Sequence, residues 1–166
     1  MTYGDFYKRW LSSAPTEGYE ITALEIVHPA FGTIRLANNT LPLTLKHEDF
    51  IWYDYQAANF VFVLPSNDLS TSDRAVARFG SLEGQLYEQV KRISVSDPTN
   101  PIKVTHRTYI STKLSKPSLI PPPLYEVENA EPSFETIDFT LRPPQLPNVR
   151  VGDYYLPSLY PGLVEI

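Results

Sequence analysis

Between Glu20 and Val63, hydrophobic residues alternate with polar or small residues at a period of two, which is typical of strands buried on one face. The alternating groups are Leu24 and Ile26, Ile34 and Leu36, and Leu41, Leu43 and Leu45. Turn-forming residues separate these groups, at His28-Pro29, Phe31-Gly32 and Asn38-Asn39. We therefore expect antiparallel strands in a meander, continued by aromatic and β-branched strands over 50–55 and 59–64.

The pattern changes to a helical period after a short strand at 75–79. Leu82, Leu86, Val90 and Ile93 recur at spacings of four and three, and Ser81 is a suitable N-cap, so we expect a helix over 82–93. Alternation then predicts a long strand over 102–110 and a last strand over 135–142, joined by a proline-rich link. These elements place a β-rich core domain at 20–142.

The two ends of the chain differ from this core. A short amphipathic helix is expected over 5–11, within an N-terminal helix and linker at 1–19, and a proline-rich aromatic arm follows at 143–166. Each end could fold back on its own core or pack on a neighbouring subunit. On the second alternative, the expected interface residues are Phe6, Trp10, Leu11, Tyr154, Tyr155, Leu156, Leu159, Tyr160 and Leu163.

Composition indicates one folded domain. The chain has 166 residues, 42% hydrophobic and 20% charged, which is enough to bury a core. Its net charge of -5 disfavours sequence-specific nucleic-acid binding, and the absence of cysteine excludes disulfides and thiolate metal sites. The N-terminus has no secretory pattern and no apolar run approaches a membrane span, so we expect synthesis in the cytoplasm and no membrane insertion.

The titratable residues do not form a recognisable catalytic, cofactor or metal motif. His28, His47 and His106 lie far apart in sequence, and we expect structural roles for all three. We expect Glu48, Asp49 and Asp54 to belong to a solvated polar face. Four basic residues lie on the 102–110 strand and in the segment that follows it. They either contact phosphate or form a solvated strand face, and the net negative charge of the chain favours the solvated face. The four residues are Lys103, Arg107, Lys113 and Lys116. No enzymatic activity is predicted.

Three segments together resemble a family of tailed-phage minor tail proteins. The first runs Ala23-Leu24-Glu25-Ile26-Val27-His28-Pro29-Ala30-Phe31, the second Val104-Thr105-His106-Arg107-Thr108-Tyr109-Ile110-Ser111, and the third Tyr160-Pro161-Gly162-Leu163. The resemblance spans nearly the whole chain, and it departs from the family pattern at Pro121-Pro122-Pro123.

This resemblance implies a structural virion protein of the tail tip or baseplate of a long-tailed phage. The implied fold is mainly β with one or two helices, an antiparallel β-sandwich or barrel with a flanking helix, like tail tube and distal tail proteins. The implied assembly is a homo-oligomeric ring, hexameric or else trimeric, with tail tube and tail hub proteins as neighbours. From the residues alone, a monomeric carbohydrate- or receptor-binding module is the alternative, with Trp52, Tyr53 and Tyr55 stacking on sugar rings.

Overall fold

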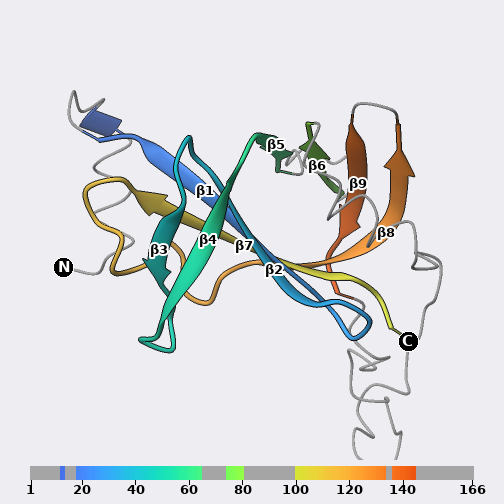
Figure 1. The fold of residues 1–166 in the computed structure, drawn as a ribbon, viewed down its shortest axis with the longest axis horizontal. Coiled ribbons are helices and arrows are strands. Elements are labelled where there is room, and N and C mark those ends of the chain that lie inside the picture. Colours follow the sequence, from blue (N-terminus) through green and yellow to red (C-terminus); the bar gives the residue numbers. More distant parts are fainter. Residues whose placement is uncertain (1–11, 14–17, 65–73, 81–99, 134–135, 145–166) are drawn as a thin grey trace, which may run out of the picture.

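The computed structural model describes residues 12–13, 18–64, 74–80, 100–133 and 136–144 (Figure 1). These residues form one sheet of nine strands, and only Ser12 and Ser13 among them are helical. The strands are β1 (Glu20–His28), β2 (Gly32–Asn38), β3 (Leu43–Lys46), β4 (Trp52–Ala58), β5 (Phe60–Val63), β6 (Ala75–Phe79), β7 (Lys103–Ile110), β8 (Leu124–Pro132) and β9 (Ile137–Arg142). The prediction of a mainly β protein is confirmed. The predicted helices over 5–11 and 82–93 lie outside the described residues.

The strand order is β3-β4-β2-β1-β7-β8-β9-β6-β5, so the predicted meander is wrong. Strand β4 lies between β2 and β3 and runs parallel to β2, whereas the other pairs are antiparallel. Strand β1 pairs along almost its whole length with β7, from Glu20 opposite Ile110 to Val27 opposite Lys103. The alternation of residues shows which side chains point inward, but it carries no signal for which distant strand lies alongside.

Strand β8 was missed by the sequence prediction, which placed it in the proline-rich link. A register shift between Val127 and Asn129 interrupts the alternation there, and a period of two is what identifies a strand in sequence. The prolines before β8 extend its pairing with β7, because the Pro123 carbonyl accepts a hydrogen bond from His106 N–H at 3.0 Å. The proline segment therefore runs beside β7 up to the start of β8.

Strands β4 and β5 stand near opposite ends of the strand order, yet only Asn59 separates them in the chain. The sheet must therefore curl strongly to bring these two strands together. The Asn59 carbonyl accepts a hydrogen bond from Gly80 N–H at 3.1 Å, which ties this junction to the end of β6. Inside the curl, the ring of Phe62 from β5 stacks on His106 from β7 with the ring centroids 4.3 Å apart. The two ends of the sheet are thus brought together around a shared interior.

The paired strands β1 and β7 are buried on both faces. One face contributes Leu24, Ile26 and Val104 to an apolar core, which continues through β5, β6, β8 and β9. The other face contributes Ile21, Ala23 and Tyr109 to a second core, whose remaining buried members are Ala37, Leu45 and Tyr55. A solvated face on β7 was therefore a wrong prediction for Arg107, which is 6% exposed.

Candidate functional site

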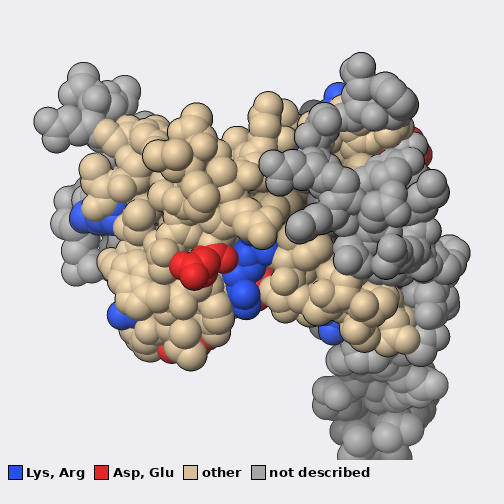
Figure 2. All heavy atoms as spheres, in the orientation of Figure 1, with Lys and Arg blue, Asp and Glu red and all other residues tan. Residues whose placement is uncertain are grey.

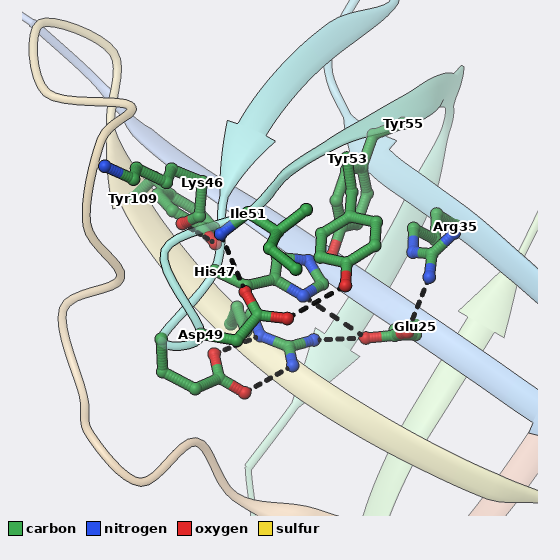
Figure 3. A network of polar contacts seen from close by, with 11 residues as sticks. Glu25, Arg35, Lys46, His47, Asp49, Ile51, Tyr53, Tyr55 and Tyr109 are labelled. Atoms are coloured by element: carbon green, nitrogen blue, oxygen red, sulfur yellow. Dashed lines mark hydrogen bonds and ion pairs between the residues drawn. The ribbon is translucent and has the colours of Figure 1, made fainter.

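A cluster of charged and polar side chains lies on the second face of the β1–β7 pair, and we call it the polar clamp (Figure 3). Strand β1 supplies an acid, β2 and β7 each supply an arginine, and the turn after β3 supplies two further groups. The members of the polar clamp are Glu25, Arg35, His47, Glu48 and Arg107. The cluster joins three strands of the sheet to the β3–β4 hairpin.

Arg107 is the centre of the polar clamp. Its Nη1 donates to Glu25 Oε2 at 2.7 Å, while its Nε and Nη2 donate to both oxygens of Glu48 at 3.0 and 2.7 Å. Glu25 also accepts a hydrogen bond from Arg35 Nη2 at 3.1 Å, so both of its oxygens are engaged. A buried guanidinium paired in two directions is stable only while both carboxylates remain ionised. The hydrogen bonds from Arg107 accordingly lower the pKa of the Glu48 carboxyl.

His47 fills the space between the polar clamp and the tyrosines of β4. Its Nε2 lies 2.6 Å from the Tyr55 hydroxyl, and its Nδ1 lies 3.8 Å from Glu25 Oε2. Burial, followed by the positive charge of Arg107, lowers the pKa of His47 and favours the neutral imidazole. Burial also raises the pKa of the Tyr55 hydroxyl, so the His47–Tyr55 contact joins two uncharged groups at neutral pH.

The turn that the polar clamp holds carries exposed apolar side chains, which we call the hairpin tip: Phe50, Ile51 and Trp52. The turn is closed by hydrogen bonds from Phe50 N–H to the His47 carbonyl at 3.1 Å and from His47 N–H to the Ile51 carbonyl at 2.9 Å. Phe50 has a φ of 65°, a conformation that side chains with a β-carbon rarely adopt, and its side chain is 79% exposed. The predicted strand over 50–55 therefore begins two residues later, at Trp52.

The chemistry available to the polar clamp is mainly structural. Both carboxylates accept hydrogen bonds from arginine, and His47 is held against Tyr55, so the described groups neutralise one another. Within the described ranges, no group of three or more acidic or histidine side chains is placed to hold a metal ion. What the arrangement does is fix the orientation of the hairpin tip relative to β1 and β7.

The described part of the chain includes the histidines and acidic residues considered in the sequence, but not the expected interface residues. The nine expected interface residues of the two ends, from Phe6 to Leu163, lie outside the described residues. The three histidines are all buried and lie in separate places. His28 accepts a hydrogen bond from Ala30 N–H at 3.1 Å, and His106 stacks on Phe62. Of the acidic residues expected on a solvated polar face, Asp49 and Asp54 are exposed, whereas Glu48 is partly exposed and pairs with Arg107.

The aromatic residues of β4 do not share one face. Tyr53 and Tyr55 point towards the polar clamp, where Tyr55 is 1% exposed and the guanidinium of Arg35 lies over the Tyr53 ring at 4.3 Å. Trp52 lies on the opposite face of the strand and is 51% exposed. A sugar platform built from all three rings is therefore contradicted by the structure.

Sequence analysis missed Glu25 and Arg107 as a functional pair, although a signal was present. Glu25 lies on the same face of β1 as Ile21, Ala23 and Val27, so it interrupts an otherwise apolar face. An acid in that position needs a buried cationic partner. Which cation supplies the charge depends on the pairing of β1 with β7, and that pairing leaves no local trace in sequence.

Comparison of the sequence with protein-family models and with curated proteins finds no match. A search of the described residues for a helix long and apolar enough to cross a membrane also finds none.

Proposed function

We propose that this chain is a non-enzymatic structural subunit of the tail tip or baseplate of a long-tailed phage. In this proposal, copies made in the host cytoplasm assemble into a closed ring, six-fold or alternatively three-fold, within the virion. The ring links the tail tube to the hub or fibres. The resemblance of three sequence segments to minor tail proteins supports the proposal, and so does the β-rich fold.

The observation that carries the proposal is the hairpin tip. Three consecutive large apolar residues are more than half exposed, with Phe50 at 79%, Ile51 at 54% and Trp52 at 51%. They are presented on a turn fixed by the buried ion pairs of the polar clamp. A rigid, exposed apolar group is characteristic of a surface that binds another protein. Its rigidity lowers the entropy cost of that binding.

The finer architecture belongs to the same proposal. We propose a barrel or sandwich, antiparallel except for the β2–β4 pair, with a helix over 82–93 against it. The junction at Asn59 supports the barrel alternative, since β4 and β5 continue one another across it while pairing with strands from the two ends of the sheet.

The alternative function is a monomeric carbohydrate- or receptor-binding module. Trp52 favours it to a limited extent, because its half-exposed ring is available for stacking. The inward orientation of Tyr53 and Tyr55 disfavours an extended sugar platform. A glycan array separates the two functions, since a structural subunit gives no signal and a binding module gives a saturable one that Trp52→Ala removes.

The ring proposal is tested by comparing the full chain with a chain ending at residue 142. Light scattering after size-exclusion chromatography is expected to give the full chain a mass about six times the 18.9 kDa of one copy. The shortened chain is expected to be monomeric with an unchanged β-type circular dichroism spectrum. An oligomer that survives the truncation contradicts the role of the C-terminal arm, and a monomeric full chain contradicts the ring.

A further inference from the structure

A second apolar surface lies on the outer face of the β5–β6 pair, and we call it the valine face: Val61, Val63, Val76 and Arg78. Val63 is directly opposite Val76, and Val61 is directly opposite Arg78, so the four side chains form one compact block. Phe60 and Phe79, which also pair, point the other way into the apolar core. The valines are not needed to fill that core, and Val61 and Val63 remain 58% and 55% exposed.

The valine face is hollowed. Among the described residues, these four line a groove of about 290 Å³. That volume is at the lower limit for a small-molecule pocket of roughly 300–1,000 Å³, and the described lining offers a single charged group, so side chains fit it better than a cofactor. The guanidinium of Arg78 is held flat against Asp138 by hydrogen bonds of 2.8 and 3.0 Å. Its charge is thereby compensated, and its planar face borders the groove.

The hairpin tip offers the exposed apolar side chains that such a groove can hold. It is aromatic and its turn is closed by hydrogen bonds, and the Lys46 ammonium lies 5.5 Å from the Phe50 ring centroid and 5.9 Å from that of Trp52. The tip carboxylate, Asp49, accepts hydrogen bonds from Tyr53 and from Ile51 N–H. With one cation and one anion on the tip, and an ion pair beside the groove, the two surfaces can meet without placing an excess of like charge together.

Phe50 itself points to a binding role. The left-handed backbone conformation at this turn position suits glycine, and a large aromatic side chain there is held in a strained conformation. The fold gains little from the ring, because it is almost fully exposed. A contact made by the exposed ring with another surface accounts for both features together.

The hairpin tip and the valine face of one copy are far apart. They lie at the two ends of the β4–β5 segment, whose length from Trp52 to Val63 is at most roughly 35 Å at ~3.3 Å per residue. Figure 1 shows the β3–β4 turn at the lower left and β5 and β6 towards the opposite end of the sheet. The described surface facing the viewer in Figure 2 is also mostly uncharged. Two complementary surfaces that cannot meet within one copy can meet between copies.

We propose that the hairpin tip of one copy docks into the valine face of the next, forming a head-to-tail contact between identical chains. This inference rests on the proposed ring function and names one contact of the ring, which is made in addition to the contacts of the C-terminal arm. A head-to-tail contact uses different surfaces on the two partners, and repeated around an axis it closes into a ring. The occupant of the groove is therefore a second copy of this chain, with Phe50 and Trp52 as the anchoring aromatics.

The experiment uses the absence of cysteine from the sequence. Two singly substituted full-length chains, Ile51→Cys and Val63→Cys, are mixed and oxidised with oxidised glutathione. Both positions are exposed, so the fold is expected to be unaffected. The mixture is expected to give a disulfide-linked dimer at least tenfold faster than either variant alone, and a chain carrying both substitutions is expected to give covalently closed oligomers.

A matched control uses Leu41→Cys, which is 68% exposed and lies outside the hairpin tip. Mixed with Val63→Cys, it is expected to cross-link only at the slow rate of random collisions. Cross-linking of Ile51→Cys mainly with itself, or a tip–groove rate equal to the Leu41 rate, overturns the inference. So does failure of Val63→Cys to react with a small maleimide, because the groove would then be covered.

The light-scattering mass of the unsubstituted chain separates this inference from the ring proposal. A ring without tip–groove cross-links overturns the head-to-tail contact alone. A monomeric chain that also lacks those cross-links overturns both the contact and the ring.

Discussion

The two faces of the β1–β7 pair are buried against opposite kinds of neighbours. On the first face, Leu24, Ile26 and Val104 pack into an apolar core that depends on shape and exclusion of water. On the second face, Glu25 and Arg107 join the polar clamp, whose contacts depend on direction and charge. The apolar core holds the sheet together. The polar clamp fixes the orientation of the β3–β4 hairpin relative to β1 and β7.

Adjacent residues of β7 show the same difference. Arg107 is buried and its guanidinium forms ion pairs with Glu25 and Glu48. His106 lies on the apolar face, and its buried Nδ1 has no hydrogen-bond partner among the described residues. Burial disfavours the charged form at both positions, so the neighbouring groups decide which charge state each residue keeps. Arg107 stays charged because Glu25 and Glu48 surround it, and His106 stays neutral because nothing compensates a charge there.

The largest expected effect comes from removing the centre of the polar clamp. Arg107→Ala leaves Glu48 without a cation and Glu25 with Arg35 alone, and breaking a buried ion pair in this way costs about 3–5 kcal/mol. Phe139→Ala in the apolar core is expected to cost a similar ~3–5 kcal/mol through the cavity it creates.

Urea unfolding at pH 7 and pH 5 distinguishes the two variants. The loss in Arg107→Ala should shrink at pH 5, because the Glu48 carboxylate, once its hydrogen bonds from Arg107 are gone, can take up a proton, while the loss in Phe139→Ala should not change. Equal pH responses of the two variants would contradict the proposed difference between the faces.

The next largest effect is the loss of folding stability in acid that protonation of His106 causes. Burial lowers the pKa of His106 from 6.5 to about 4 in the folded protein, so the folded state disfavours its protonation. The stability from the neutral ring is complete above pH 6.5 and is lost as the pH falls towards 4, in total about 3 kcal/mol at 1.36 kcal/mol per pKa unit.

His106→Phe should remove this component, because phenylalanine keeps the stack on Phe62 without titrating. Unfolding free energies measured from pH 7.5 to 4.5 should fall less steeply for the variant. The residual slope in this range then reports the lowered pKa of His47, while the lowered pKa of Glu48 acts in the same direction at lower pH, around and below 4.5. Parallel curves for the variant and the unsubstituted chain would count against a neutral His106.

A smaller effect is expected from Tyr55→Phe. The substitution keeps the buried ring but removes the hydroxyl 2.6 Å from His47 Nε2, at a cost of about 1–2 kcal/mol. Tyr53→Phe is the matched control, because its hydroxyl is bonded to the exposed Asp49, and a smaller loss is expected there. Thermal unfolding ranks the two variants, and a greater loss for Tyr53→Phe would show that the hairpin is held from its exposed side.

The smallest effect is a gain. Phe50→Gly relieves the left-handed backbone strain and should stabilise the monomer by up to ~1 kcal/mol. Phe50→Ala also removes the ring but keeps a β-carbon in the strained conformation, so the difference between the two variants isolates the backbone effect. Chemical denaturation under monomeric conditions measures the free energy of unfolding of both variants. A higher value for Phe50→Ala than for Phe50→Gly would contradict the backbone strain.

The sequence predicted the strands better than their arrangement. Periodic alternation located β1, β2 and β7 because local side-chain patterns follow from burial on the two sides of a strand. It missed β8, where a bulge breaks the period, and it missed the parallel contact between β2 and β4. Those features depend on residues far apart in the chain.

The candidate site was the hardest part to predict. Glu25 and Arg107 are 82 residues apart, and each alone resembles an ordinary polar position in a strand. The exposed Phe50 was assigned to a strand, because an aromatic residue rarely occupies a left-handed turn position. Expected interface residues at both chain ends remain predictions.

Native mass spectrometry of the full-length chain tests most directly whether this protein is a ring-forming subunit. We predict one dominant closed species, of six copies or alternatively three, with few intermediate sizes, because a ring that closes leaves no free tip or groove. A single 18.9 kDa species at every concentration tested would contradict that claim.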